Sequence, residues 1–372
     1  MLSLAHLRSP RRLVGGALLV TASLALAACG SSSSATTSAT ATPSPVPSSY
    51  APTTVTLLTH DSFALTEKLL AEFTARSGIT VKVVSAGDAG EVVNKAALTA
   101  GNPEGDVLFG VDSTLLSRAL TAQVFDPYVS PSAAQVDPAL RASTSDAVTP
   151  IDYGDVCVNI DTRWFADKGI APPTTLADLA DPRYKDLLVV QNAATSSPGL
   201  AFLLATVARY GEEGYLDYWK SLRANGVKVV NGWTEAYEGE FSAGGKGTRP
   251  LVVSYASSPP AEIVYAADPK PTTPTTAVMT DGCFRQVEYA GVLRGTTQPQ
   301  AARAVVDWLL SPEVQADVPL SMFVFPARTG TPLPDVFEKF AARPAEPLTL
   351  DPARIDAQRS TWIDAWDQVT LR

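Results

Sequence analysis

Histidine is almost absent from this chain of 372 residues, which contains only His6 and His60. A zinc site built from several histidines therefore lacks its ligands. A Ser-His-Asp triad would have to use one of these two residues, and the chain has no G-x-S-x-G turn to present a serine. The glycine-rich loops that bind nucleotide phosphates are missing as well. The sequence therefore indicates a protein that is not an enzyme and that uses no cofactor or metal ion.

Long hydrophobic runs are also absent, with one exception near the N-terminus. After Arg8, Arg11 and Arg12, residues 13–28 are uncharged and mostly apolar. This length is typical of the core of a signal peptide and short for a membrane span. The run ends in L-A-A-C-G, which resembles the bacterial lipobox, a signal whose cysteine, here Cys29, receives a lipid. Residues 1–28 are thus predicted to be a lipoprotein signal peptide; the alternative is a plain cleavage site that precedes a cysteine.

The segment that follows has almost nothing to bury. Residues 30–49 carry no charge and are mostly Ser, Thr, Ala and Pro, so residues 29–52 are predicted to form a disordered tether. The remaining chain of roughly 320 residues is long enough for two domains with hydrophobic cores. Removing the signal takes away three Arg and no acid, which changes the formal charge from −9 to −12. Such an acidic body disfavours nucleic acid and suits a cationic small ligand.

Cysteine is scarce too, and its three positions are informative. If Cys29 carries lipid, Cys157 and Cys283 remain as a pair in an oxidising compartment, where a disulfide is expected. A bridge that closes about 125 residues would contribute roughly 4–5 kcal/mol to stability by chain-entropy arguments. The alternative is two buried free thiols.

The body of the chain alternates between short apolar runs and helical patterns. Ser196, Ser197 and Pro198 form a helix start, because Ser is a good N-cap and Pro is favoured in the first turn. Alternation of strands and helices with short loops predicts an α/β sheet with ligand loops at the carboxyl ends of its strands. The predicted strands are 55–58, 79–84, 106–109, 187–190, 227–230 and 251–255, and the predicted helices include 65–77, 113–119, 200–210, 298–310 and 353–366.

Several of these segments, in order along residues 55–340, resemble motifs of one receptor family, the thiamine-binding receptors of bacterial ABC importers. Any one of them is weak, but the whole set at similar spacing is specific. The matches are T-H-D-S-F at 59–63 (T-Y-D-S-F in the family), D-V-L-F-G-V-D at 106–112 (D-V-V-L-G-L-D), T-S-S-P-G-L at 195–200 (T-S-T-P-G-L), G-W-T-E-A-Y at 232–237 (G-W-S-E-A-Y), L-V-V-S-Y-A-S-S-P at 251–259 (L-V-L-S-Y-T-T-S-P), then Q-V-E at 286–288 and F-P at 325–326.

The resemblance implies a two-lobed type II periplasmic-binding-protein fold whose lobes are joined by a hinge of two crossing strands. The crossings are expected near Tyr153 and Gly282, so that residues 53–153 form the first part of lobe 1, 154–281 form lobe 2, and 282–372 return to lobe 1 and end in helices. This arrangement would place both cysteines of the predicted disulfide at the hinge.

The resemblance also implies a ligand site. Trp233 and Tyr255 match aromatic positions that would face the thiazolium cation, although a lone Trp in a loop is commonly a packing residue. Asp88 matches an acidic loop residue used on the ligand, and its alternative role is a helix N-cap. Ser196 and Ser197 would hold the hydroxyethyl arm or its phosphate at a helix start, unless they only cap the helix. The full predicted set is His60, Asp61, Asp88, Ala89, Ser196, Ser197, Trp233, Tyr255, Ala256, Ser257, Ser258 and Phe323.

Three positions depart from the family pattern. His60 stands where Tyr is common, Ala89 where Gly is common, and Phe323 where Trp is common. His60 could alter phosphate preference or introduce pH dependence, because histidine titrates near neutral pH. Phe323 keeps a smaller aromatic face. These changes leave open whether the ligand is thiamine or one of its phosphate esters.

The predicted function is therefore extracytoplasmic thiamine capture by a lipid-anchored monomer at the outer face of the cytoplasmic membrane, with ABC permease subunits as partners. A polyamine receptor of the same fold remains an alternative, whereas an iron site is disfavoured because Tyr255 has no adjacent Tyr. An exported hydrolase built on His60, Asp61 and Ser62 is a remote alternative, since neighbouring residues on a strand point to opposite faces. A structural or adhesive lipoprotein is equally remote.

Overall fold

The computed structural model describes residues 50–142, 145–244 and 246–372. The predicted signal peptide, Cys29 and the tether up to residue 49 lie outside these ranges. Among the helices of the described residues, none is both long enough and apolar enough to cross a membrane.

The described residues build one mixed nine-stranded sheet with the strand order β2-β1-β3-β8-β4-β7-β5-β6, and β9 pairs with β4. β1 is parallel to β2 and β3, and β5 is parallel to β6 and β7, whereas the contacts of β8 with β3 and β4 are antiparallel. The strands are β1 Thr53–Thr59, β2 Ile79–Ser85, β3 Val107–Asp112, β4 Thr149–Asp161, β5 Leu188–Gln191, β6 Lys228–Val230, β7 Leu251–Tyr255, β8 Thr276–Val292 and β9 Phe325–Pro326.

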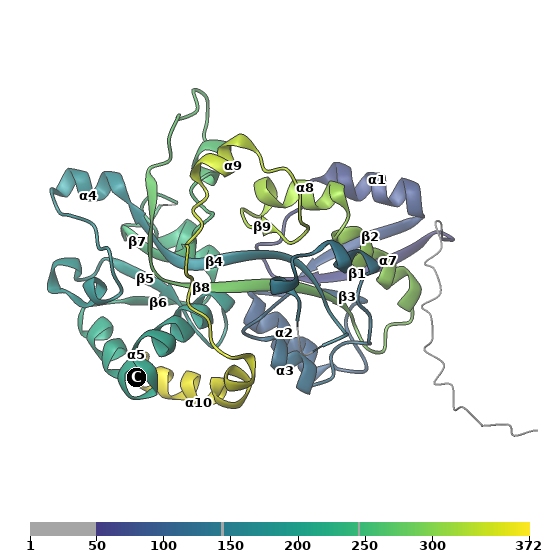
Figure 1. Ribbon diagram of the computed structural model, residues 1–372, viewed down its shortest axis with the longest axis horizontal. Coiled ribbons are helices and arrows are strands. Elements are labelled where there is room, and N and C mark those ends of the chain that lie inside the picture. The colour runs from purple at the N-terminus through teal and green to yellow at the C-terminus, as the bar shows by residue number, and fades with distance from the viewer. Residues whose placement is uncertain (1–49, 143–144, 245) are drawn as a thin grey trace, which may run out of the picture. The chain divides into compact units, whose positions relative to one another are not determined.

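The two longest strands, β4 and β8, connect the two halves of the sheet. Figure 1 shows them running side by side from the half that contains β1 to β3 into the half that contains β5 to β7. The sequence prediction of a two-lobed α/β fold with two crossing strands is therefore confirmed. The predicted crossing points, Tyr153 and Gly282, lie within β4 and β8 respectively.

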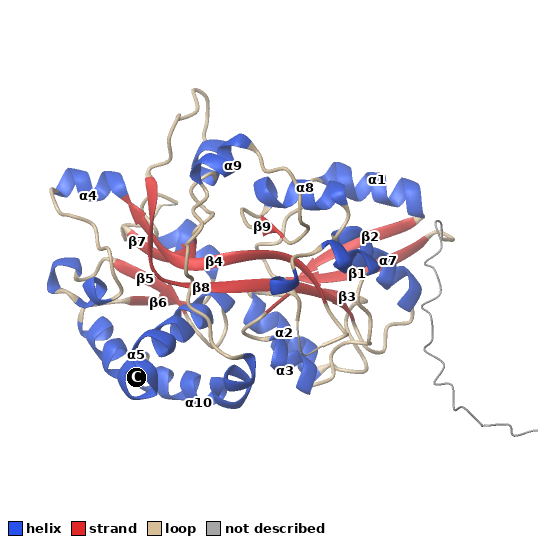
Figure 2. Cartoon of the chain, in the orientation of Figure 1, coloured by secondary structure: helices blue, strands red, loops and turns tan. Residues whose placement is uncertain are grey.

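Helices cover both faces of the sheet (Figure 2). This arrangement explains why inner strands such as β3 and β5 are buried along their whole length, as strands covered on both faces are. The helices are α1 Glu67–Ser77, α2 Ala89–Leu98, α3 Leu116–Thr121, α4 Thr162–Lys168, α5 Ser197–Ala224, α6 Ala261–Val264, α7 Pro299–Leu309, α8 Pro312–Ser321, α9 Asp335–Phe340 and α10 Pro352–Thr370, with short 3₁₀ turns at Pro131–Gln135, Pro138–Leu140, Ala177–Ala180 and Pro182–Tyr184.

The longest helix, α5, continues beyond its predicted end. The sequence predicts a helix that ends at Tyr210, and the next residue, Gly211, has a non-helical conformation with φ +73°. The chain then resumes as a helix to Ala224 and buries Trp219 against Trp366 of α10, with ring centroids 5.5 Å apart. The glycine therefore interrupts the helix without ending it, since packing against α10 stabilises the second half.

Cys157 of β4 and Cys283 of β8 form a disulfide bond. Both are buried in a small cluster with Ala256, which is the residue that follows β7. The predicted pairing is thus confirmed, and the alternative of two free thiols is wrong. The bond joins the two strands that connect the halves of the sheet.

Candidate functional site

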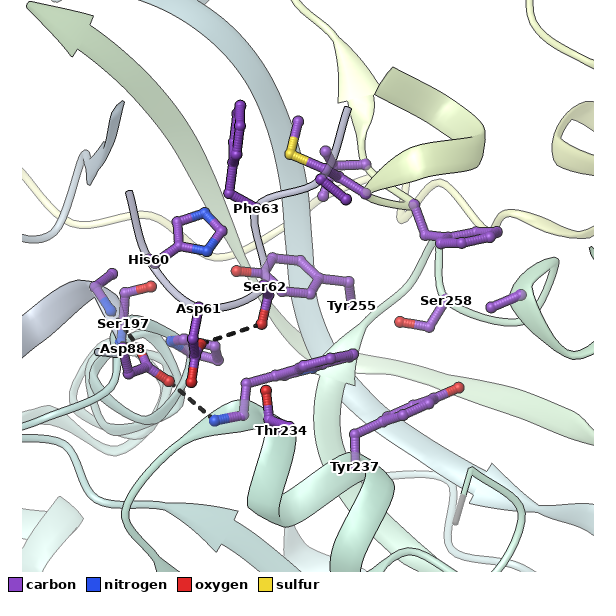
Figure 3. A pocket seen from close by; sticks show the side chains of 18 of the residues that line it. His60, Asp61, Ser62, Phe63, Asp88, Ser197, Thr234, Tyr237, Tyr255 and Ser258 are labelled. Carbon is purple, nitrogen blue, oxygen red and sulfur yellow. Dashed lines mark hydrogen bonds between the residues drawn. The ribbon is translucent and has the colours of Figure 1, made fainter. Parts of the chain in front are cut away.

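One cavity of about 420 Å³ lies between segments from both halves of the sheet, a volume typical of small-molecule sites. Figure 3 shows His60, Asp61 and Phe63 on one side of this space and Thr234 and Tyr237 on the other. The lining residues are His60, Asp61, Ser62, Phe63, Ala64, Asp88, Ala89, Ser197, Pro198, Trp233, Thr234, Tyr237, Glu238, Tyr255, Ser258, Ala261, Tyr265, Glu288, Ser321, Met322, Phe323 and Val324.

Most of the residues singled out from the sequence come together in this cavity. Ser196, Ala256 and Ser257 do not line it and are buried behind its wall. The Ala256 N–H donates to the Asp155 carbonyl oxygen at 2.8 Å, which continues the pairing of β7 with β4 by one residue. The predicted residues that do line it are His60, Asp61, Asp88, Ala89, Ser197, Trp233, Tyr255, Ser258 and Phe323.

A stacked aromatic pair forms one wall. The rings of Trp233 and Tyr237 are nearly parallel, with centroids 4.9 Å apart and an interplanar angle of 12°. The Trp233 indole N–H donates to Ser254 Oγ at 2.9 Å, so the ring is fixed by packing on one face and by a hydrogen bond at its edge. Tyr237 comes from a π-helical turn, Glu235–Glu240, that starts two residues after Trp233. The pair presents a rigid aromatic surface on which a flat cation can stack.

Asp88 connects the two walls. It is the N-cap of α2, and its carboxylate accepts the Ala89 N–H at 2.6 Å. From the opposite wall, the carboxylate also accepts the backbone N–H of Trp233 at 2.9 Å and that of Ser197, the first residue of α5, at 3.4 Å. Burial raises the pKa of Asp88, whereas the Trp233 N–H and the charge of His60 lower it. Asp88 therefore serves the N-cap role foreseen from the sequence and also connects the two walls where they meet.

The backbones of the two walls approach closely beside Asp88. A Cβ atom at Gly90 would lie 2.5 Å from the Thr195 carbonyl oxygen, and one at Gly232 would lie 3.1 Å from Asp88 Oδ2. Only glycine allows the first of these contacts without movement of the backbone. The contact between the segments that start α2 and α5 thus depends on the absence of a side chain at Gly90.

His60 lies at the end of β1 and contacts an acid that sequence reasoning missed. Its Nε2 is 3.4 Å from Glu288 Oε1. Burial lowers the pKa of His60, but the charges of Glu288, Asp88 and Asp61 outweigh burial and raise it above its ordinary value. The ring occupies the space beside Gly110, where a Cβ atom would lie 2.4 Å from the His60 Cδ2 atom.

The rim carries a second aromatic contact. Tyr265 is 70% exposed, and its ring centroid is 5.4 Å from that of Phe323. Phe323 has φ +56°, a left-handed conformation that is costly for a non-glycine residue. Such an outlier is common at ligand sites. Tyr265 was not foreseen because it lies in an irregular segment with no periodic pattern.

Comparisons with known proteins agree with this geometry. The family pattern described as bacterial extracellular solute-binding protein matches residues 102–344. The thiamine-binding periplasmic protein of Escherichia coli K12 is 30% identical over 327 residues, which cover 87% of this chain and 95% of that relative. The corresponding protein of Brucella suis is 27% identical over 332 residues, covering 88% of this chain and 95% of its own.

Solved structures agree as well. A periplasmic thiamin binding protein superimposes with a TM-score of 0.76 at 29% identity, covering 86% of this chain and 96% of its own. Iron-bound HitA from Pseudomonas aeruginosa has a TM-score of 0.68 at 21% identity, covering 86% of this chain and 99% of its own, so it shares the fold. The chain therefore belongs to the bacterial extracellular solute-binding protein family and is a receptor rather than an enzyme.

Proposed function

We propose that this protein is an extracytoplasmic receptor for thiamine or a thiamine phosphate, which it delivers to the permease of an ABC importer. The observation that carries the proposal is the cavity itself, in which a rigid aromatic pair, Trp233 and Tyr237, faces the carboxylates of Asp88 and Glu288. A flat organic cation needs both features, since stacking supplies contact and a carboxylate selects the sign of the charge. The likeness to thiamine-binding relatives along most of their length supports the same ligand.

Each part of thiamine has a counterpart in the cavity. The thiazolium ring would stack on Trp233, and Tyr255 would border it, while Asp88 would accept a hydrogen bond from the aminopyrimidine amine. The hydroxyls of Ser197 and Ser258 would contact the hydroxyethyl arm. Because the Ser197 N–H already donates to Asp88, an esterifying phosphate would have to compete with that carboxylate.

The lobes and the anchor belong to the same proposal. Residues 53–153 with 282–372 would form one lobe and 154–281 the other, and the two would close on the ligand as a monomer. Cys29 would carry the lipid that holds the receptor at the outer face of the cytoplasmic membrane, and residues 29–52 would form its tether. Release of the protein into the medium by Cys29→Ser would support the anchor, and unchanged retention at the membrane would contradict it.

The test of the ligand is a calorimetric titration of the chain from residue 46 onward, whose described part is one compact unit with its own core. After unfolding and refolding to remove ligand, it is titrated with thiamine, thiamine monophosphate, thiamine diphosphate and spermidine. Saturable one-to-one binding of a thiamine compound supports the proposal. Binding of spermidine alone would indicate a polyamine receptor, and heat from none of the four would overturn the thiamine assignment.

A further inference from the structure

Three acids lie side by side across neighbouring strands beneath the cavity. In the register of the sheet, Glu288 of β8 is opposite Asp112 of β3 and also opposite Asp152 of β4. Asp112 and Asp152 are fully buried, and Glu288 is 8% exposed and reaches the cavity. Like charges directly opposite each other destabilise a sheet, and a buried charge without a partner is costly. The row therefore cannot hold three negative charges without compensation.

The compensation differs along the row. Asp112 has its own donors, the Thr114 and Leu115 N–H groups and the Thr114 hydroxyl at 2.7–3.0 Å, as well as the amide of Gln286. Burial raises the pKa of Asp112 to about 7, although these donors favour its charged form. When Asp112 is charged, the groups that stabilise it therefore belong to the protein itself and not to a ligand.

Asp152 has no such donors. Neither of its carboxyl oxygens accepts a hydrogen bond from a donor in the described part of the chain. Burial and the neighbouring Glu288 raise the pKa of Asp152 well above its ordinary value. The neutral form of Asp152 is therefore favoured, whereas the neighbouring His60 lowers the pKa of Glu288, so Glu288 is the member of the pair that carries the charge.

Among the residues that the structure describes, Glu288 has one cationic partner, His60, at the wall of the cavity. The other ionisable groups around this pair are acidic or neutral: Asp61 beside His60, Asp88 from the start of α2, and Tyr255 from β7. Within the described residues, His60 Nε2 has no hydrogen-bond partner beyond the contact with Glu288. The proton on His60 is thus held by a carboxylate that a cationic ligand in the cavity would also contact.

We propose that Glu288 is the counter-ion for the cationic part of the ligand, and that the bound cation replaces the proton carried by His60. This inference rests on the proposed function and deepens it. When the cation binds, the imidazolium loses one proton to water and becomes neutral, while Glu288 keeps its single negative charge. The net charge of the cluster is unchanged when a protonated His60 loses its proton, so each cation bound releases up to one proton, depending on pH.

The sign of the resulting pH dependence follows directly. Without ligand the pKa of His60 lies above its ordinary value, and a cation nearby lowers it. Protons are released between these two pKa values, and there the affinity for the cation rises with pH by at most about tenfold per unit for one proton. Above the ligand-free pKa of His60 the affinity becomes independent of pH.

The chain offers a clean measurement, because His60 is its only histidine after residue 6. In the untagged chain from residue 46 onward, the imidazole NMR signal gives the pKa of His60 with and without thiamine. Calorimetry in two buffers of different ionisation enthalpy gives the number of protons released. We expect a lower pKa of His60 in the complex and release of up to one proton at a pH between the two values.

Two isosteric variants separate the roles of the acids. Glu288→Gln is expected to lower the ligand-free pKa of His60 and to weaken thiamine binding at least tenfold. Asp152→Asn, which makes the neutral form permanent, is expected to keep the pKa of His60 above its ordinary value. Thiamine binding with an unchanged His60 pKa would overturn this inference and leave the proposed function standing, whereas the absence of binding by every thiamine compound would overturn both.

Discussion

The two walls of the cavity differ in chemistry. The wall that follows β1 and β2 carries charge, with His60 and Asp88 as its main groups, whereas the wall that follows β6 carries the stacked rings of Trp233 and Tyr237. Charge selects the sign of a ligand at long range, and aromatic contact supplies most of the binding area at short range. The division implies that neither wall alone forms a complete site.

Asp88 is the residue that joins the two kinds of wall. Its carboxylate caps α2 and accepts the backbone N–H of Trp233, so the position of the aromatic surface depends on a charged group from the other side. Three kinds of substitution should therefore have separable effects on stability and on ligand affinity. The first changes stability without touching either wall, the second removes the aromatic surface, and the third breaks the connection between the walls.

The largest expected effect lies outside both walls. Replacing Cys157 and Cys283 together by Ser opens a loop with a sequence separation of 126 residues. We expect the free energy of unfolding to fall by about 4 kcal/mol, because the unfolded chain gains conformational freedom. Thermal or denaturant unfolding measures this loss, and thiamine affinity should change little because neither residue lines the cavity. Reduced wild-type protein is the control. Equal stability of the oxidised wild type, the reduced wild type and the double Ser variant would contradict the prediction.

The second largest effect is expected from a substitution in the aromatic wall. Trp233→Ala removes the ring that stacks on Tyr237 and should weaken thiamine binding on the order of 100-fold, which corresponds to about 2–3 kcal/mol of aromatic and cation–π contact. Calorimetric titration measures the loss. The matched control is Trp164→Ala in α4, which makes the same chemical change away from the cavity. Equal affinity of the Trp233 variant and wild type would show that the ligand does not use this wall.

The third effect is expected from a substitution that breaks the connection between the two walls. Asp88→Asn replaces one acceptor oxygen by an NH₂ group that cannot accept the N–H groups of Ala89 and Trp233 together. We expect roughly tenfold weaker thiamine binding, because a lost charge-assisted hydrogen bond costs about 1.5–3 kcal/mol and is partly replaced by the amide. Calorimetry is again the measurement.

The matched control for Asp88 is Asp351→Asn. Asp351 also caps a helix, α10, by accepting the Ala353 N–H at 2.9 Å, and it lies outside the cavity. Both variants should lose some helix stability, and only Asp88→Asn should lose affinity. If both variants bind thiamine as wild type does, Asp88 does not connect the walls in the way its hydrogen bonds indicate.

The charged wall was easier to predict from the sequence than the acids behind it. His60 directly follows β1, and Asp88 lies in the loop between β2 and α2; residues that follow neighbouring parallel strands meet at one edge of a sheet. Glu288 lies within a long strand whose neighbouring residues are buried, and the sequence gives no sign that its charged side chain reaches a cavity. Its pairing with Asp152 depends on the register of β4 and β8, which are more than a hundred residues apart in sequence, and local patterns do not specify that register.

Neighbouring residues in a motif also proved to have different environments. All four serines at positions 196, 197, 257 and 258 are buried, but only Ser197 and Ser258 line the cavity. The motif identifies the segment, but the direction of each side chain depends on how the turn is anchored. After β7, for example, the hydrogen bond from Ala256 to Asp155 continues the pairing with β4, and the Ser258 N–H then donates to the Tyr255 carbonyl oxygen at 3.1 Å.

The smallest expected effect concerns the rim of the cavity, where Tyr265 contacts Phe323. Its ring contacts Phe323 at a centroid distance of 5.4 Å and is otherwise largely exposed. Tyr265→Ala should weaken thiamine binding about threefold, because an exposed aromatic contact contributes only about 0.5–1 kcal/mol. Tyr265→Phe keeps the ring and should bind as wild type does in the same titration. If the Phe variant loses as much affinity as the Ala variant, the hydroxyl of Tyr265 rather than its ring contacts the ligand at the rim.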